Sequence, residues 1–525
     1  MPEITAQKTL VIYGSHDASV TFIDKNNELR VFEYERFVKR RYSMFSSSFD
    51  SRESLGSNED ERKHFIALIK ENLADPDITN IFYLELDEND KILIQGFFPL
   101  AKFSTFPHHL AHSNGAYHLS KFDNALIFSV DGGGIDYEAV STINVYLANH
   151  GEISSIHKTS IDYGSAYQSI GDVLSDIRKD HTHMTYAGKI MGLCAYGKIR
   201  EEWLPHSIEY FMSGAGAGIE SYISNLGLPQ GDLSGNDAWD LAATHQKAFE
   251  KVMMDLVKTY YNVYPMDIVL TGGCALNVLF NQKISMDLAT RNHSVFVPPN
   301  PNDCGLTHGW FLHLFPEYKN RESVYSGMHI LDAPELGKYL NEYTHKKITT
   351  ERLVDLLLEG KILGFITNNS EIGPRALGNR SIVCYPAFEG MKDILNAKVK
   401  FREWYRPFAP VCKLEDMHTF FDEAIESPYM SYAPIVKTEF SKDLSAIVHV
   451  DNSARLQTVT KESHERFYEI LIEIQSRAKI PVILNTSFNI RGNPILTTYA
   501  DAFYVLDTTQ LDCVVTEDYI FYKKS

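Results

Sequence analysis

The hydrophobic and polar positions of this chain alternate in a way that is typical of a mixed α/β fold. Apolar side chains dominate residues 8–14 (KTLVIYG) and 20–24 (VTFID), with the polar turn SHDAS between them. Residues 61–73 instead place apolar side chains at helical spacing, and residues 78–86 (ITNIFYLEL) return to a strand-like run. Because the period of the pattern distinguishes helices from strands, we expect the two kinds of element to follow one another along the chain.

A second group of elements brings histidines close to a strand that ends in glycines. HHLAH is expected to be helical, which puts His108 and His112 on one face and turns His109 away from them. The strand ALIFSVD ends on Asp131, and three glycines follow it. Two imidazoles and a carboxylate suit a transition metal, and glycines let backbone amides approach an anion. A helix with surface histidines before an ordinary strand-to-turn junction is the alternative.

One more carboxylate bears on the choice between a metal site and a helix with surface histidines. Asp303 lies in the loop VPPNPNDCGL, directly before another helical pattern. An aspartate in such a loop is most often a helix cap. Together with two histidines and Asp131, however, it is a candidate fourth ligand of the metal site.

Two glycine-rich segments further along are candidate phosphate contacts. Residues 184–198 (MTYAGKIMGLCAYGK) place glycines around Lys189, where tight helix packing is the simpler explanation. In MDIVLTGGCALN, a buried strand leads through Gly272 and Gly273 into a helix. Backbone N–H groups at the start of a helix favour anions, so this turn suits the phosphate or ribose of a nucleotide.

The second half of the chain gathers basic residues around another helix and strand, expected within residues 349–367. EIGPRALGNRS combines glycines with Arg375 and Arg380, and KVKFREWYRPF interleaves four cations with aromatic residues. A solvated stripe is the alternative, but the aromatic residues favour a walled pocket in which guanidinium groups bind phosphate. HVDNSARLQTV and LNTSFNIRGNPI add polar side chains suited to phosphate or ribose; the polar candidates of these four segments are Arg375, Lys398, Lys400, Arg402, Arg406, His449, Arg455, Gln457, Asn485, Ser487 and Asn489.

Composition narrows the class of protein. A chain of 525 residues with 44% hydrophobic and 22% charged residues is expected to form two globular domains. No apolar run approaches the ~18 residues of a membrane span, and no signal peptide is recognisable. The six cysteines are scattered singly, which favours a reducing cytoplasm. A net charge of -18 argues against broad electrostatic capture of nucleic acid.

The motifs, in their order along the chain, resemble the O-carbamoyltransferases of the NodU/CmcH type, which act on nodulation factors, cephamycin and nebramycin. The matching blocks are GSHDASV, HHLAHSNGAY, VDGGG, GKIMGLCAYG, TGGCALN, NDCG, SEIGPRALGNRSIVCYP, KFREWYRPFAPV, SPYM, HVDNSARLQTV and LNTSFNIRGNPI. The resemblance covers nearly the whole chain. It implies an actin/hexokinase-like (ASKHA) domain over about residues 1–330, similar to the tRNA threonylcarbamoyl-transfer protein, and a YrdC-like α/β domain over about residues 345–525.

The resemblance also implies a two-step reaction. The YrdC-like domain would make carbamoyl-adenylate from carbamoyl phosphate and ATP, with Mg²⁺, and the N-terminal domain would transfer the carbamoyl group to an acceptor hydroxyl. His108, His112, Asp131 and Asp303 would hold iron, or alternatively zinc. His16, beside Asp17, is the candidate base near the acceptor, and Lys189 and Arg36 are candidates for stabilising the adenylate phosphate. Nucleotide and phosphate contacts are expected from Gly132, Gly133, Gly134, Gly272, Gly273, Asn277, Arg375, Lys400, Arg402, Arg406, His449, Arg455, Gln457, Asn485, Ser487 and Asn489.

The chain departs from the family pattern at a few positions. Thr367, Asn368 and Asn369 stand where Gln-Gly-Arg is usual, and Asn493 stands where a glutamate is typical. Tyr42 lies near the position of a frequent histidine. These departures affect the expected details of the C-terminal pocket and the acceptor geometry rather than the fold.

Three readings of the function remain. The favoured one is a cytoplasmic carbamoyltransferase acting on a small molecule, natural product or sugar, without membrane contact. A second is carbamoylation of a hydroxymethyl pyrimidine in a nucleotide or nucleic acid, which would show a basic path to the metal site. A third is a non-catalytic regulator that binds metal or nucleotide. The sequence leaves open the acceptor and whether the chain forms a homodimer.

Overall fold

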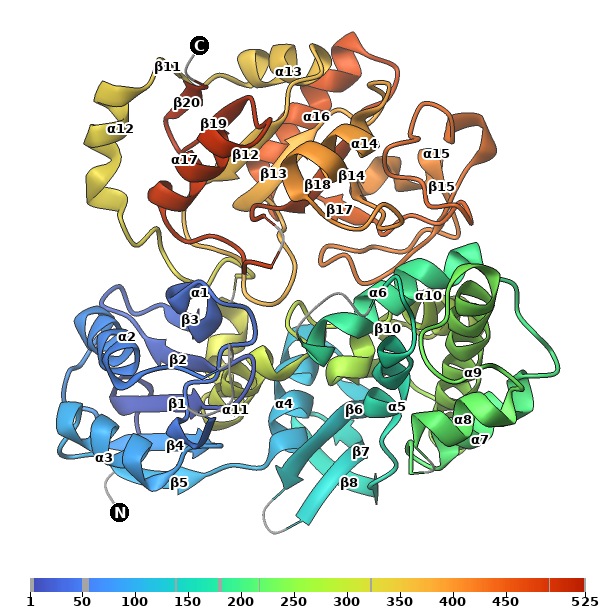
Figure 1. Cartoon of the computed structure of the whole chain (residues 1–525). Helices are drawn as coiled ribbons and strands as arrows, with labels where there is room; N and C mark the ends of the chain where they lie inside the picture. Colours follow the sequence, from blue (N-terminus) through green and yellow to red (C-terminus); the bar gives the residue numbers. More distant parts are fainter. Residues whose placement is uncertain are drawn as a thin grey trace. The chain divides into compact units, whose positions relative to one another are not determined.

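The structure is a computed structural model that describes residues 4–49, 56–136, 139–177, 182–216, 218–321, 323–490 and 492–523 (Figure 1). The chain divides into two compact units. Unit 1 comprises Met1–Thr105, Glu317–Val448 and Asn452–Ser525, and unit 2 comprises Phe106–Pro316 and His449–Asp451. Both units combine strands with helices, so the predicted α/β fold class is confirmed.

Unit 1 begins with a five-stranded sheet in the order β3-β2-β1-β4-β5. Strands β1 to β3 form an antiparallel meander, and β4 and β5 continue the sheet parallel to β1. Phe65 and Ile69, one helical turn apart, pack with Phe22 of the sheet in one hydrophobic core. The elements are β1 (Thr9–Tyr13), β2 (Ser19–Ile23), β3 (Leu29–Glu33), α1 (Tyr34–Val38), α2 (Glu59–Asn72), β4 (Asn80–Leu84), α3 (Glu88–Phe97) and β5 (Lys102–Thr105).

Unit 2 contains a second five-stranded sheet with the same topology. Its order is β8-β7-β6-β9-β10, with β6 to β8 antiparallel and β9 and β10 parallel to β6. Its strands are β6 (Asn124–Asp136), β7 (Ala139–Asn149), β8 (Glu152–Thr159), β9 (Ile268–Thr271) and β10 (Val295–Phe296). Its helices are α4 (His108–Ser120), α5 (Tyr163–Ser169), α6 (Tyr186–Leu193), α7 (Leu204–Met212), α8 (Ile219–Asn225), α9 (Gly235–Tyr261), α10 (Val278–Ala289) and α11 (Leu306–Leu314).

The rest of unit 1 is built on an eight-stranded sheet in the order β11-β20-β19-β12-β13-β18-β14-β17. Its strands are β11 (His345–Lys347), β12 (Leu363–Ile366), β13 (Arg380–Cys384), β14 (Ala409–Lys413), β17 (Gln457–Val459), β18 (Ile483–Ser487), β19 (Cys513–Val515) and β20 (Tyr519–Tyr522). The remaining elements are α12 (Leu336–Glu342), α13 (Thr350–Leu358), α14 (Met391–Leu395), α15 (Met417–Phe420), β15 (Phe421–Asp422), β16 (Ile435–Val436), α16 (Glu465–Arg477) and α17 (Tyr499–Thr508).

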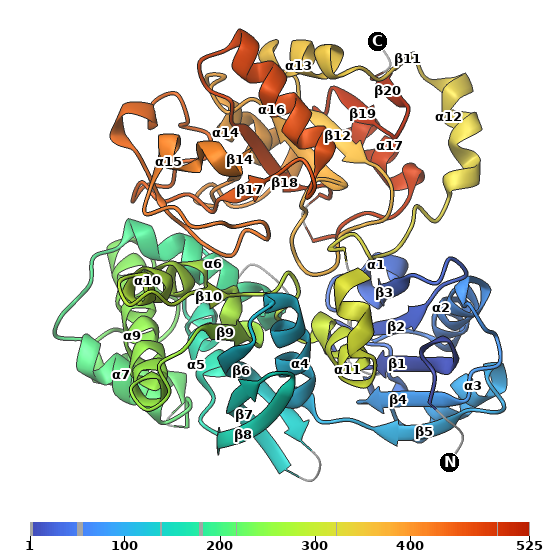
Figure 2. The same ribbon diagram turned by 180° about the vertical axis from the view of Figure 1, so that it is seen from behind.

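Alternation along β13 explains how this sheet is covered on both faces. Ile382 and Cys384 belong to a core shared with α14 and α17, whereas Val383 belongs to a core shared with α13 and α16. Successive side chains of a strand point to opposite faces, so one strand serves both cores. The helices of the two faces are seen in turn in Figures 1 and 2. Strands buried on both faces read as continuous apolar runs, as β12 does.

The two compact units have other bounds than the two predicted domains. The first five-stranded sheet, within residues 1–105, clusters with the C-terminal half, and the chain changes unit near residue 317. The functional division at about residues 330–345 stays a prediction. All six cysteines are buried and unpaired. Among the described residues, no helix has the length and low polarity needed to cross a bilayer.

Candidate functional site

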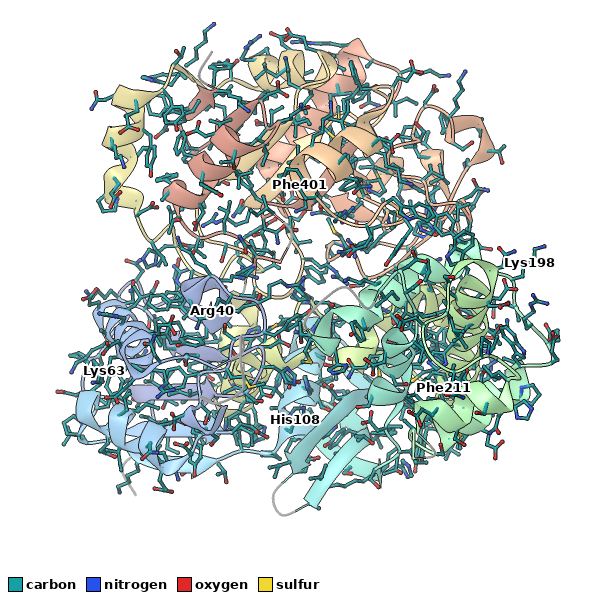
Figure 3. All side chains as sticks on the ribbon, viewed as in Figure 1. Arg40, Lys63, His108, Lys198, Phe211 and Phe401 are labelled. Atoms are coloured by element: carbon teal, nitrogen blue, oxygen red, sulfur yellow. The ribbon has the colours of Figure 1, made fainter. Side chains whose placement is uncertain are left out.

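The paired histidines lie on the first turns of α4, as predicted. Helix α4 crosses α11 at close range, because a Cβ atom added to Gly115 would lie 2.9 Å from the Cα atom of Gly309. Asp303 stands directly before α11, so this close crossing brings its carboxylate to the start of α4. The start of α4 is marked by His108 in Figure 3.

Strand β6 supplies the remaining carboxylate. The register between β6 and β7 shifts between Val130 and Gly134, so the strand is irregular where Asp131 leaves it. A Cβ atom on Gly134 would lie 2.1 Å from the ring of His108, so only glycine allows this approach. Gly133 has a φ of +135°, which a side chain would strain. The glycines therefore let the strand and the helix meet at the site.

The four side chains converge on one point. The Nε2 atom of His112 lies 3.1 Å from Oδ2 of Asp131 and 3.3 Å from Oδ1 of Asp303. The Nε2 atom of His108 lies 3.5 Å from Oδ1 of Asp303 and 3.9 Å from Oδ2 of Asp131. All four candidate ligand atoms lie within 4.8 Å of one another.

The imidazoles and carboxylates of this cluster shift one another's pKa values, because each stabilises the charged form of the other. Burial alone would lower the pKa of His112, but Asp131 and Asp303 raise it to about 9. Burial would likewise raise the pKa of Asp131, yet the two histidines hold it well below its usual range. In the absence of an ion, the carboxylates draw a proton to the imidazole, and a bound cation would take its place.

The residues fit a transition metal. Two imidazole nitrogens and two carboxylate oxygens form the mixed donor set that iron and zinc accept. The buried Nε2 atom of His108 has no hydrogen-bond partner among the described residues, and it faces the two carboxylates. An unsatisfied buried nitrogen is costly unless something binds it. The cluster is therefore a candidate metal centre.

His109 points away from the cluster, as predicted, and fixes the helix to the strand. Its Nδ1 atom lies 2.9 Å from Oδ2 of Asp136, and its backbone N–H donates to the other carboxylate oxygen at 2.9 Å. Asn144 and Ser141 donate to Oδ2 of Asp136 as well. This buried network joins β6 and β7 to the first turns of α4, which carry the candidate ligands.

Replacing Asp136 by Ala is expected to lower the free energy of unfolding by about 3–5 kcal/mol, because it leaves several buried donors without an acceptor. Urea denaturation followed by circular dichroism measures the change. Asp255, in an exposed ion pair with Lys251 on α9, is the matched control and should change little when replaced by Ala. Equal unfolding midpoints for the two variants would contradict the role given to Asp136.

The second glycine turn also contacts this cluster. The backbone N–H of Gly273 donates to Oδ2 of Asp131 at 3.0 Å, and Gly272 has a φ of +83°, where an added Cβ atom would lie 2.3 Å from the carbonyl oxygen of Val130. Asn277 is different, because its side chain caps α10 through the N–H of Phe280. The turn therefore orients a candidate ligand, whereas Asn277 is occupied by capping and by Gln246.

The loop that carries Arg375 surrounds the buried carboxylate of Glu371, a residue that sequence analysis did not single out. One oxygen of Glu371 accepts four backbone N–H groups, those of Leu377, Gly378, Asn379 and Arg380, at 2.7–3.2 Å. The fully buried guanidinium of Arg380 donates to the carbonyls of Thr367 and Asn368. Arg380 therefore shapes the loop instead of binding an anion, which corrects the reading of the pair Arg375 and Arg380.

Polar side chains from the sheet hold the same loop. Asn485 Nδ2 donates to the carbonyl of Ala376 at 3.0 Å and to the amide oxygen of Gln457 at 2.8 Å. Gln457 in turn donates to the carbonyl of Leu377 at 2.9 Å. The GPRALG and NTSFN segments thus meet, as expected. The contacts described for Gln457 and Asn485 position this loop.

Lys400 contacts the end of β18 and the residues that follow it. It is 4% exposed, and its Nζ donates to the carbonyls of Ser487 at 2.6 Å and Asn489 at 2.8 Å. Burial, then the charges of Arg402 and Arg406, hold the pKa of Lys400 well below its usual range. Asn489 also donates to the carbonyl of Asn493, so that departure from the family pattern lies beside Lys400.

The arginines around Lys400 differ in how they are held. Arg402 donates to Asn396 and to the carbonyl of Pro407, and stacks 4.0 Å from the ring of Phe408. The Nε atom of Arg455 is buried without a hydrogen-bond partner among the described residues. Burial, then Arg375 and Arg406, hold the pKa of Arg455 well below its usual range. Such mutual repulsion is relieved by a bound anion, so these side chains form a candidate anion pocket.

The other predicted residues of these segments differ from one another in their surroundings. Arg36 is 2% exposed, and its guanidinium donates to the backbone carbonyls of Glu371 and Gly373; its role at the adenylate phosphate stays a prediction. His449 belongs to unit 2, where its ring lies 5.5 Å from that of Tyr196, whereas the anion pocket belongs to unit 1. Among the walls of the pocket, Phe401 and Trp404 are exposed while Tyr405 and Phe408 are buried.

The remaining catalytic candidates lie in different units. His16 and Asp17 form the expected turn of unit 1, with Nδ1 of His16 3.3 Å from Oδ2 of Asp17. Lys189 is 3% exposed on α6 of unit 2. Their catalytic roles stay predictions.

Comparison with known proteins matches both halves of the chain. A family model described as carbamoyltransferase N-terminus matches residues 56–310, and one described as carbamoyltransferase C-terminus matches residues 354–523. An uncharacterized protein of Methanocaldococcus jannaschii is 30% identical over 451 residues, 80% of this chain and 83% of that protein.

Two further relatives carry names that describe a process or an activity. Nodulation protein NolNO of Sinorhizobium fredii is 29% identical, over 81% of this chain and 65% of that protein. The 3'-hydroxymethylcephem-O-carbamoyltransferase of Amycolatopsis lactamdurans is 32% identical over 48% of each chain. Full-length HypF in its phosphate- and nucleotide-bound form is 12% identical with a TM-score of 0.34, covering 60% of this chain and 56% of that one, and this likeness carries no inference. The chain therefore belongs to the carbamoyltransferase family, as its motifs predicted, and is an enzyme of that class.

Proposed function

We propose that this chain is an ATP-dependent O-carbamoyltransferase that first makes carbamoyl-adenylate from carbamoyl phosphate and then carbamoylates an acceptor hydroxyl. The main support is the group of buried cations in unit 1, where burial and then the charge of Arg406, among others, lower the pKa of Arg375, Lys400 and Arg455. Burying several like charges is costly unless a ligand of opposite charge occupies the space between them. Carbamoyl phosphate and ATP supply that charge.

The first step needs groups that stabilise phosphate oxygens. Water cleaves carbamoyl phosphate to carbamate and phosphate, and a carbamate oxygen then attacks the α-phosphorus of ATP, with Mg²⁺ on the phosphates. The bond to pyrophosphate breaks, which leaves carbamoyl-adenylate. Negative charge builds up on phosphate oxygens in this step, and fixed guanidinium groups such as Arg455 stabilise that charge without reorganising.

The second step forms a carbamate ester. The acceptor hydroxyl oxygen attacks the carbamoyl carbon, AMP leaves, and the hydroxyl proton passes to a base, for which His16 beside Asp17 is the candidate. His108, His112, Asp131 and Asp303 would hold a metal ion. When bound, this ion would supply Lewis-acid stabilisation of the adenylate. Lys189 is a further candidate for stabilising the leaving phosphate.

The protein as purified is expected to contain one iron or zinc ion per chain, with iron the more favoured, because the mixed donor set is complete. Elemental analysis by mass spectrometry measures the metal, and Asp131→Asn should reduce its content. Full activity in the presence of chelator, together with no transition metal in the protein, would rule the metal centre out.

The acceptor is the remaining question, and one experiment addresses both acceptor and reaction. The protein is incubated with carbamoyl phosphate, ATP, Mg²⁺ and one candidate acceptor at a time, drawn from sugars, antibiotic cores and hydroxymethyl pyrimidine nucleosides. Mass spectrometry should show one acceptor gaining a carbamoyl group, with AMP and pyrophosphate formed. Pyrophosphate release that does not depend on carbamoyl phosphate would contradict the proposed first step.

A further inference from the structure

The loop formed by residues 371–380 is closed from inside by a single carboxylate oxygen. The side chain of Glu371 is fully buried, and its Oε1 atom accepts the consecutive backbone N–H groups of residues 377–380 at 2.7–3.2 Å. Its Oε2 atom has no hydrogen-bond partner among the described residues, so one oxygen makes all four of these contacts. Gly378 has a φ of +142°, and a Cβ atom there would lie 2.0 Å from the ring of His464, so the loop closes in this way only with glycine at that position.

The same loop is also fastened from outside, by residues far away in the sequence. The guanidinium of Arg36 donates to two of its carbonyls, both at 2.6 Å, and the N–H of Gly373 donates to Oε1 of Glu33 at 2.8 Å. On the other side, amide side chains of β17 and β18 donate to the carbonyls of residues 376–377. The backbone is therefore fixed both before and after Arg375.

The guanidinium of Arg375 has no partner, although the backbone that carries it is fixed. Among the described residues it makes no hydrogen bond and no ion pair, and the side chain is half-buried. The second arginine of the loop differs, because Arg380 donates to the carbonyls of Thr367 and Asn368. A guanidinium removed from water without an acceptor is costly, and an oxyanion supplies both acceptors and opposite charge. The loop therefore holds one cation whose hydrogen-bond donors remain available for a ligand.

We propose that Glu371 is a positioning residue, which closes the loop and thereby holds Arg375 where it binds a phosphate oxygen of carbamoyl phosphate or ATP. This inference rests on the proposed function. Glu371 is enclosed by backbone, so it acts through Arg375 and not by touching a substrate. A loop that is already in place loses little conformational entropy when the anion binds, and binding is tighter for that reason.

The competing explanation is that Glu371 only stabilises the fold. In that case its replacement would lower the free energy of unfolding, but the folded protein would bind its substrates with unchanged half-saturating concentrations. A positioning Glu371 would change the half-saturating concentration of the substrate whose phosphate contacts Arg375, and it would do so only while Arg375 is present. Substrate dependence therefore separates the two roles.

The test is carbamoyl-phosphate-dependent exchange of labelled pyrophosphate into ATP, measured with the full chain while first carbamoyl phosphate and then ATP is varied. Glu371→Ala should raise at least one of the two half-saturating concentrations by about ten- to a hundredfold, the effect expected when a binding group is misplaced. The substrate affected identifies the source of the phosphate. Glu371→Gln should give a smaller rise, because its amide oxygen still accepts the N–H groups but lacks the negative charge.

A double-mutant cycle with Arg375 gives the decisive comparison. Arg375→Ala alone should raise the same half-saturating concentration, and adding Glu371→Ala should change that value by less than about twofold, because the positioning residue has nothing left to hold. Where Glu371→Ala does not fold, Glu371→Gln takes its place in the cycle. Equal effects of the Glu371 variant with and without Arg375, or unchanged half-saturation in the folded single variants, would overturn the proposal.

Asp332 is the matched control, since its carboxylate also accepts backbone N–H groups in unit 1, those of Tyr499 at 2.6 Å and Ala500 at 2.9 Å. Asp332→Ala should lower the melting temperature but leave both half-saturating concentrations within about twofold of the unsubstituted protein. A comparable rise in Asp332→Ala would mean that a general loss of stability explains the effect, which would also overturn the proposal. If the unsubstituted chain showed no exchange, the proposed function would fail, and the inference with it.

Discussion

Replacing His112 by Ala is expected to remove carbamoyl transfer while leaving the release of pyrophosphate that depends on carbamoyl phosphate. The side chain of His112 contacts both carboxylates of the candidate metal centre, at 3.1 and 3.3 Å, so its loss takes away one of the four candidate ligands. Changes around a metal ligand alone cost about 10–100-fold, so losing a ligand should reduce transfer by at least about a hundredfold.

The first step should survive because its groups lie in unit 1, whereas His112 lies in unit 2. Transfer is measured as carbamoylated acceptor and adenylate formation as released pyrophosphate, in parallel samples. His118 is the control on the same helix, and His118→Ala should leave both rates unchanged. Thermal melting accompanies each assay, since His112 is buried and its removal leaves a cavity. Loss of pyrophosphate release in a folded His112→Ala protein would refute this division of labour.

The convergence of His108, His112, Asp131 and Asp303 could be predicted from the sequence because short local patterns mark these residues. Four-residue spacing on a helix puts His108 and His112 on one face, whatever surrounds them. Asp131 was recognised from the glycines behind it, and these glycines prove to be needed where Gly134 meets the ring of His108. What the sequence could not show is the network of Asp136, whose partners come from a helix and from the next strand.

The arginines near the N-terminus show what local sequence patterns cannot predict. Arg36 and Arg41 belong to one basic run, and nothing local tells them apart. The structure places the guanidinium of Arg36 against two buried backbone carbonyls, whereas Arg41 donates to the hydroxyl of Tyr42. Which contacts each side chain makes depends on backbone turns that the surrounding fold imposes, such as those at Lys39 and Tyr42. The positive charge of both residues could be read from the sequence, but the contacts of their side chains could not.

Contacts between residues far apart in the sequence also decide the surroundings of other predicted residues, and local patterns do not reveal them. Glu371 organises the loop that carries Arg375 by accepting four backbone N–H groups, and no spacing in the sequence indicates that role. His449 was grouped with Arg455 because the two are close in the sequence, yet they fall in different units. The first five-stranded sheet shares a unit with the C-terminal half for a similar reason, because contacts within a fold need not follow chain order.

Replacing Arg455 by Ala is expected to suppress both steps, and supplying pre-formed carbamoyl-adenylate should restore transfer. The buried Nε atom of Arg455 has no hydrogen-bond partner among the described residues, and its charge is opposed by Arg375 and Arg406. A phosphate oxygen is the group that relieves both conditions. Losing one charged phosphate contact costs about 3 kcal/mol, a rate factor of about a hundred or more.

Because removing Arg455 also removes a repulsive charge from the pocket, the folded protein should not lose stability in proportion to its lost rate. This separates a binding role from a structural one. Arg455→Lys should retain part of the rate, since it keeps the charge without the planar fork. Arg477 on α16, in an exposed ion pair with Asp355 on α13, is the control, and Arg477→Ala should leave both steps unchanged. If Arg455→Ala lost transfer even with pre-formed carbamoyl-adenylate, Arg455 would act in the second step, and the assignment of the anion pocket to the first step would be wrong.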